Sequence, residues 1–188
     1  MQANEFNEVL LNRRSLRALA TTPIPREMSL RVLEAARWAP SCSNSQPWRF
    51  VVIEDEPELN AVKSALKPGN QKWASSAPMI IVVCANPEDD YLASGQPLYL
   101  FDCGLATENL LLQGVAEGLV MHPMAGWEEQ PMKDAIGLPD PYRVVCVIAA
   151  GFPGPVENLD VDLQEREKSP RVRKPLDEIV VFGTWPKV

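Results

Sequence analysis

The sequence has little histidine, no clustered cysteine and no long apolar run, and each shortage argues against a class of protein. One histidine, His122, and four scattered cysteines without a C-x-x-C pair argue against a zinc site. No apolar stretch approaches the roughly 18 to 20 residues that span a bilayer, so no membrane partner is expected. Polar and acidic residues precede the first short apolar stretch, unlike a signal peptide. We therefore expect a cytoplasmic protein with reduced thiols.

Basic residues are also in short supply. The chain has 18 Lys and Arg against 25 Asp and Glu, a net charge of -7. A nucleic-acid surface needs a basic face, so we expect no nucleic-acid partner. Local concentrations of positive charge are more informative in such a chain. There are two, Arg13, Arg14 and Arg17 near the start and Arg171, Arg173 and Lys174 near the end.

The pattern of apolar residues predicts one α+β domain over residues 1–188. At 188 residues, 46% of them hydrophobic, the chain is long enough to bury a core, and no linker divides it. The G-x-G-x-x-G fingerprint of a Rossmann dinucleotide site is missing from the Gly-rich turn at 151–154. Apolar periodicity predicts helices at 4–13, 26–38, 57–66, 97–119 and 128–136, and strands at 50–53, 79–85 and 144–152.

Two regions of this outline carry further expectations. In the long helix, Leu105, Leu112, Val115 and Leu119 form the predicted apolar stripe. From about residue 155 to 188 the chain is rich in proline and charge, and we expect an extended C-terminal arm that cannot fold by itself. Its one apolar run, 179–182, is a candidate late strand. The arm would then lie across a sheet edge, its own or a partner's.

The segment RRSLR, residues 13–17, has two interpretations. Three arginines in five residues cannot be buried unpaired. They are either a solvated helix end, where cations favour the negative pole of the helix dipole, or an anion site. Ser15 between them supports the second, because its hydroxyl would add a hydrogen bond to a phosphate held by planar guanidinium groups.

The loop APSCSNSQPW, residues 39–48, also has two interpretations. It is rich in small hydroxyls and side-chain amides and is bounded by proline and tryptophan. Such a loop is either a plain helix-to-strand connection or a rigid polar surface that presents donors and acceptors to a planar heterocycle. Cys42 is not expected to be a nucleophile, because no histidine or strong base is near it in the sequence.

Several motifs together resemble the nitroreductase family of flavoproteins. R-R-S-x-R is followed by a helix and by A-P-S-x-x-N-x-Q-P-W-x-F. FDCGLA with NLLL resembles the family's central dimer helix, and PMAGW resembles its flavin-face loop. The strand that ends in Gly-Phe-Pro and the late Arg-Val-Arg, residues 171–173, complete the order. The resemblance covers nearly the whole chain.

This resemblance implies a three-layer α+β fold, with a mixed, mainly antiparallel sheet flanked by helices, in an intertwined homodimer. Two FMN sites at the interface would each use both subunits. Arg13, Arg171 and Arg173 would hold the phosphate with Arg14 and Ser15, and Arg17 would reach the pyrimidine edge of the ring. The remaining cofactor-binding residues implied are Pro40, Ser41, Cys42 and Asn44 from the other subunit, Asn70 or Gln71, and Pro123, Met124, Ala125 and Gly126.

The implied activity is reduction of nitroaromatics, quinones or similar electron-poor acceptors with NADH or NADPH, by ping-pong two-electron transfer. The flavin carries this chemistry, so no dedicated catalytic side chain and no metal are expected. Two alternatives stay open: a specialised flavin enzyme (dehalogenase, enone reductase or flavin-cleaving), or a flavin-binding storage or sensor protein. The residues do not distinguish NADH from NADPH. The acidic loop 86–96 stands where longer relatives could cover the active site, so the acceptor is open too.

Overall fold

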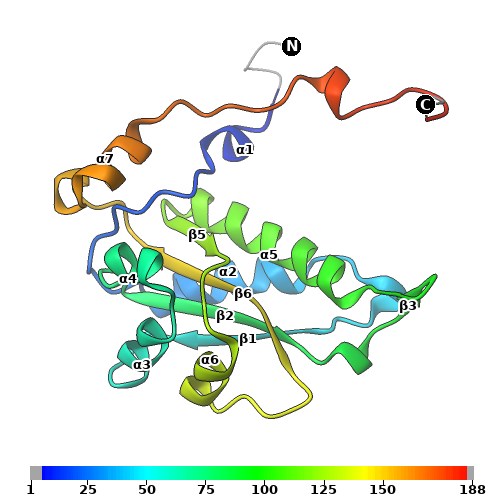
Figure 1. The fold of residues 1–188 in the computed structure, drawn as a ribbon, viewed down its shortest axis with the longest axis horizontal. Coiled ribbons are helices and arrows are strands. Elements are labelled where there is room, and N and C mark those ends of the chain that lie inside the picture. Colours follow the sequence, from blue (N-terminus) through cyan, green and yellow to red (C-terminus); the bar gives the residue numbers. More distant parts are fainter. Residues whose placement is uncertain (1–5, 186–188) are drawn as a thin grey trace.

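A four-stranded antiparallel sheet forms the middle layer of the molecule (Figure 1). The computed structural model describes residues 6–185. The strands of the sheet are β1 (Trp48–Ile53), β2 (Met79–Ala85), β5 (Val120–Met124) and β6 (Arg143–Gly151). They lie in the order β1-β2-β6-β5, and each neighbouring pair is antiparallel. A small separate hairpin consists of β3 (Leu92–Ala93) and β4 (Gln96–Pro97).

Helices cover both faces of this sheet. They are α1 (Glu8–Asn12), α2 (Arg26–Arg37), α3 (Glu58–Ser64), α4 (Pro68–Ala74), α5 (Tyr99–Ala116), α6 (Glu129–Ile136) and α7 (Val161–Lys168). Short 3-10 turns lie at Cys42–Asn44, Pro87–Asp89, Val156–Asn158 and Leu176–Glu178. Buried residues of α3, α4, α6 and α7 share one core cluster, and those of α2 and α5 share the other. The result is a three-layer helix–sheet–helix arrangement.

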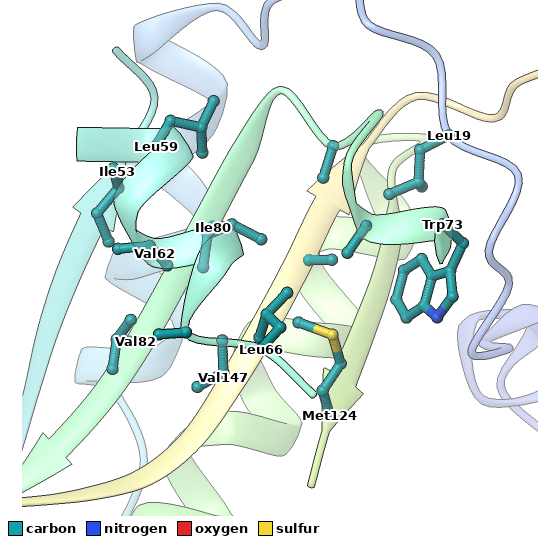
Figure 2. Close-up of a cluster of buried hydrophobic side chains, with 14 of the residues drawn as sticks. Leu19, Ile53, Leu59, Val62, Leu66, Trp73, Ile80, Val82, Met124 and Val147 are labelled. Atoms are coloured by element: carbon teal, nitrogen blue, oxygen red, sulfur yellow. The ribbon is translucent and has the colours of Figure 1, made fainter. Parts of the chain in front are cut away.

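The central strand β2 explains why the sheet sits between two cores. All seven of its residues are buried. Because side chains alternate between the faces of a strand, Ile80 and Val82 enter one core while Ile81 and Val83 enter the other. Figure 2 shows the first core, where Val62 of α3 lies over the sheet and Trp73 of α4 closes one end. A continuous apolar run is the pattern expected of a strand covered on both faces.

The fold class expected from the sequence is confirmed, but three elements differ from expectation. The fourth strand, β5, lies where the sequence predicted a helix exit and a loop. Proline argues against a strand, but β5 is an edge strand, where the missing N–H of Pro123 is tolerated. The short helices α4 and α7 were also missed. Pro68, just after the helix predicted at 57–66, starts α4 at its first position.

The predicted apolar stripe of the long helix is only partly confirmed. Leu119 is buried and Leu105 packs against the core, but α5 ends at Ala116, before Leu119. The face of α5 that packs on the sheet carries Cys103, Ala106, Leu110 and Gly114, among others. Leu105, Leu112 and Val115 are only half-buried. Their flank, together with exposed Leu100 and Phe101, is apolar surface that one chain leaves uncovered.

The first helix and the extended C-terminal arm are both shorter than predicted. The first helix begins at Glu8 rather than residue 4, which lies outside the described residues, and the side chain of Asn7 caps it. The arm is extended only from residue 169, because α7 precedes it. The predicted late strand at 179–182 is wrong for the single chain, since these residues are exposed and pair with no strand of the described sheet. Within residues 6–185, no helix is long and apolar enough to cross a membrane.

Candidate functional site

The two arginine-rich segments, more than 150 residues apart in sequence, meet in space. Figure 1 shows the arm after α7 passing beside α1 and the segment that follows it. Arg171 donates hydrogen bonds to the carbonyl oxygens of Leu10, at 3.0 Å, and Leu11. Arg14 in turn donates to the carbonyl oxygens of Glu167, at 3.3 Å, and Ser169, at 2.9 Å. We call Arg13, Arg14, Arg171 and Arg173 the arginine cluster.

The two reciprocal contacts have a common physical cause. The last carbonyl groups of a helix have no partner within the helix, and they carry the negative end of its dipole. Arg171 binds the end of α1, and Arg14 binds the end of α7. These two guanidinium groups are therefore partly occupied with holding the chain ends together.

The arginine cluster carries positive charge that forms no ion pair with a carboxylate of the described residues. Partial burial, and then the positive charges of Arg173, Arg13 and Arg14, lower the pKa of Arg171 below its ordinary value. Among the described residues, the guanidinium of Arg13 hydrogen-bonds only to the hydroxyl of Ser15, at 3.4 Å, and that of Arg173 only to the carbonyl oxygen of Val172, at 2.8 Å. Such a cluster is suited to an anionic ligand with several oxygens.

Arg17 differs from the cluster because it has a buried acidic partner. Its guanidinium lies 3.4 Å from an Oε1 atom of Glu167 on α7, and its backbone N–H donates to the same oxygen at 2.8 Å. The side chain of Glu167 is 4% exposed and that of Arg17 is 24% exposed. The carboxylate therefore fixes both ends of Arg17, while the other N–H groups of its guanidinium stay free to bind a ligand.

The segment that carries Arg17 is held against the sheet by close backbone contact. Ala20 donates from its backbone N–H to the carbonyl of Phe152, and Gly154 donates to that of Ala18, each at 2.9 Å. A Cβ atom on Gly154 would stand 2.6 Å from the backbone of Leu19, so no other residue fits there without displacement. Gly154 thus permits the approach that places residues 13–17 beside β5 and β6.

His122 on β5 contacts the segment 13–17 through its side chain. Its Nδ1–H donates to the carbonyl oxygen of Leu16 at 2.8 Å, and its ring stacks on Trp73 with centroids 4.3 Å apart. The sequence favoured a structural or surface role for this residue, and its buried, stacked position is a structural one. With Nδ1 as donor, the neutral ring leaves Nε2 as an acceptor.

His122 is expected to remain neutral far below the pH at which a free imidazole is protonated. Burial, and then the charges of Arg17 and Arg13, lower its pKa from 6.5 to about 4, although the bond to Leu16 opposes the shift. As the pH falls, the unfolded chain binds the imidazole proton before the folded chain does. The free energy of unfolding that comes from the neutral imidazole is therefore fully present above about pH 6.5, and about 3 kcal/mol of it is lost as the pH falls toward 4. The single imidazole signal followed by NMR should titrate near pH 4, and a midpoint near 6.5 would contradict this placement.

Asn70 and Gly126, both expected from the sequence, lie together at the start of α4. The Asn70 side-chain amide donates to the carbonyl of Gly126 at 3.1 Å, and the backbone N–H of Lys67 donates to it at 2.9 Å. Gln71 points elsewhere, because its amide donates to the carbonyls of Ser64 and Leu66. Of the two alternatives left open by the sequence, the geometry favours Asn70.

The remaining residues of the predicted flavin-face segment have different environments. Met124 is buried in the core, where Figure 2 shows it near Leu66 and Val147, so only its backbone is available to a ligand. Pro123 is half-buried on β5, and Ala125 is exposed just beyond the strand. Backbone groups at 125 and 126 are therefore the accessible part of this segment.

The polar loop at 40–46 is held in an unusual conformation. Ser43, Asn44 and Gln46 have positive φ angles of 49°, 61° and 49°, which side-chain-bearing residues rarely adopt. Hydrogen bonds hold the loop there. The backbone N–H of Cys42 donates to buried Asp102 at 2.8 Å, and that of Gln46 donates to the Ser41 hydroxyl at 2.9 Å. Strained backbone of this kind occurs often at ligand sites. Pro40 and Asn44 are exposed, and Ser41 and Cys42 are half-buried.

This loop and the segment beside His122 adjoin opposite edges of the sheet within one chain. The loop precedes β1, at one edge of the sheet, whereas His122 lies on β5 at the other edge. Trp48 pairs through Ala85 with Arg143, and His122 pairs with Ala149, six residues further along β6. With strands about 4.8 Å apart and a rise of about 3.3 Å per residue, Trp48 and His122 are roughly 25 Å apart. One chain therefore does not bring the two predicted halves together.

Two acidic residues that contact the site were not predicted from the sequence. Asp102 stands within an apolar helical run, and an isolated carboxylate in such a run is a signal of a buried, hydrogen-bonded group. Glu167 gave no such signal, because it lies in the highly charged stretch VDLQEREK, whose helix was itself not predicted.

Fold and site together define a three-layer α+β protein in which an arginine cluster gathers where the two arginine-rich segments meet. A model of the nitroreductase family matches residues 10–67 and 57–152. The chain is 33% identical, over 79% of its length and 86% of the relative's, to an Archaeoglobus fulgidus protein named "Putative NADH dehydrogenase/NAD(P)H nitroreductase". It is 28% identical to the 5,6-dimethylbenzimidazole synthase of Rhodospirillum rubrum, over 86% of this chain and 90% of that one.

A solved structure described as an oxidoreductase containing FMN is similar along almost the whole chain. Its TM-score is 0.89 and its identity 32%, and the match covers 99% of this chain and 96% of that one. The chain belongs to the nitroreductase family.

Proposed function

We propose that this protein is an FMN-dependent oxidoreductase that uses NADH or NADPH to reduce nitroaromatics, quinones or similar electron-poor acceptors in a ping-pong scheme. Its relatives include proteins named as NAD(P)H nitroreductase and as an oxidoreductase containing FMN, which supports this class of activity.

The observation that carries this proposal is the arginine cluster. Four guanidinium groups from the two chain ends gather without a carboxylate partner among the described residues, and the pKa of Arg171 is lowered in part by its neighbours' charges. A phosphate group supplies the missing negative charge and several acceptor oxygens. The cluster therefore fits the phosphate of FMN, whose isoalloxazine ring alone would not need it.

The residues of the site have different roles in binding FMN. Arg13 and Arg173 have the guanidinium groups least occupied by the protein, so they are the principal phosphate ligands, with Ser15 beside Arg13. Arg14 and Arg171 add charge while they hold the helix ends. Arg17 would bind the pyrimidine edge of the ring, and Asn70, which donates to the carbonyl of Gly126, would add a polar contact together with the backbone at 125–126.

A second copy of the chain completes the site. Among the described residues, no hydrogen bond joins the arginine cluster to the loop with Pro40, Ser41, Cys42 and Asn44, which adjoins the opposite edge of the sheet from β5. A homodimer would bring the partner's loop to the ring and would also cover apolar surface, such as Phe101 on α5 and Phe182 on the arm, which are 64% and 93% exposed.

The chemistry needs few side-chain functions. When bound, FMN supplies two-electron transfer between a nicotinamide and an acceptor. Arg17 would stabilise negative charge at the pyrimidine edge, and backbone donors at 125–126 would orient the ring. His122 stays neutral and supports the segment rather than moving protons.

Anaerobic titration of the FMN-loaded protein tests this activity. NADH or NADPH should bleach the flavin absorption, and a nitroaromatic or quinone should then restore it. Bleaching by dithionite alone would contradict the proposal and favour a flavin-binding protein without turnover. A protein unable to take up FMN would exclude flavin-based functions altogether.

A specialised flavin enzyme of the same fold is the second candidate. The synthase relative supports it, because a chain of similar length and sequence carries a different enzyme name. Bleaching by a nicotinamide without reoxidation by any nitroaromatic or quinone would favour this candidate over the first.

A further inference from the structure

Glu167 is a buried acidic residue at the edge of an otherwise basic site. It lies on α7 and its side chain is only 4% exposed. Among the described residues, the ion pair that it forms with Arg17 is the only one in which any of Arg13, Arg14, Arg17, Arg171 or Arg173 takes part. Burial of a carboxylate costs free energy unless bonds to its charged form compensate.

The contacts of Glu167 are directed at Arg17 rather than at the arginine cluster. One carboxylate oxygen accepts from the Arg17 backbone at 2.8 Å and lies 3.4 Å from its guanidinium. Arg14, in contrast, contacts the backbone carbonyl of residue 167 and not the carboxylate. The negative charge therefore acts mainly on one arginine, which the proposed function places at the flavin ring.

We propose that Glu167 is a positioning residue that holds Arg17 at the flavin and lowers the reduction potential of bound FMN by offsetting part of the arginine's charge. The inference rests on the proposed function. Two-electron reduction of FMN with uptake of one proton leaves a negative charge at the pyrimidine edge of the ring. Arg17 stabilises that charge and Glu167 opposes it, so the pair sets how strongly the reduced form is favoured.

Replacing Glu167 with Gln removes the charge and keeps an oxygen that accepts from the Arg17 backbone. We expect reduced FMN to be favoured about tenfold more over oxidised FMN in E167Q, an upward shift of about 30 mV for a two-electron couple. Spectroelectrochemical titration of the FMN-loaded proteins measures this shift. E165Q is the matched control, because Glu165 is an exposed residue of the same helix and the change in net charge is identical.

A double-mutant cycle tests whether Glu167 acts on the flavin potential through Arg17. R17Q alone should lower the potential, and in the R17Q background E167Q should shift it by much less than in the wild type. A potential unchanged in E167Q, or equal shifts in E165Q and E167Q, would overturn the inference. If the shifts in reduction potential caused by R17Q and E167Q simply add, the claim that Glu167 acts through Arg17 is overturned.

Two further outcomes keep the test decisive. If E167Q is recovered without FMN, E167D should still give an upward shift, because its shorter side chain withdraws the charge from the guanidinium; an unchanged or lower potential overturns the inference. Failure of the wild type itself to bind FMN would refute the proposed function, whereas FMN binding with an unchanged E167Q potential refutes only the role of Glu167.

Discussion

Replacing both Arg13 and Arg173 with alanine is expected to weaken FMN binding by about 100-fold or more. Each guanidinium forms charge-assisted bonds worth about 1.5 to 3 kcal/mol, so the loss of both amounts to roughly 3 to 6 kcal/mol, which corresponds to about 10² to 10⁴ in Kd. The two residues suit this test because neither holds a helix end or an ion pair among the described residues. Titration of the apoprotein by quenching of flavin fluorescence measures the change.

The matched control is R26A/R143A, which removes two positive charges at exposed positions away from the arginine cluster. Arg26 pairs with Glu54, and Arg143 pairs with Glu129. This control should bind FMN within a few-fold of the wild type. Arg171→Ala is a less clean test, because Arg171 also binds the carbonyls at the end of α1. If R13A/R173A bound FMN as tightly as the wild type, the arginine cluster would not be the phosphate site.

The arginine cluster shows how far the sequence could lead. Two basic segments in an acidic chain were each open to interpretation as solvated surface, and it was the order of several motifs that joined them into one site. The structure adds that the segments do meet, through contacts between Arg171 and α1 and between Arg14 and α7. It also changes the division of roles, since Arg171 holds the fold as well as adding charge.

Elements with strong periodicity were predictable and weakly patterned ones were not. The run 79–85 was identified with its bounds because a strand buried on both faces is apolar throughout. The edge strand β5 contains His122 and Pro123, and α7 is mostly charged, so neither showed an apolar period. Their placement depends on tertiary contacts, such as the stacking of His122 on Trp73 and the burial of Glu167 against Arg17.

The polar loop marks the limit of what one chain can show. Its composition suggested a ligand surface, and its three positive φ angles and its bond to Asp102 support that idea. Its distance from the arginines, however, follows from the strand order, which composition does not reveal. Under the proposed function, assembly of both halves into one site would need a second chain.

Comparison of FMN with riboflavin tests the central claim most directly. The two ligands share the isoalloxazine ring and differ in the phosphate, which is the group that the arginine cluster should bind. We expect the wild-type protein to bind FMN about 100-fold or more tightly than riboflavin, because charge-assisted bonds to the phosphate are lost with riboflavin. The preference should largely disappear in R13A/R173A. Equal affinity of the wild type for FMN and riboflavin would contradict the claim that these arginines form a phosphate site.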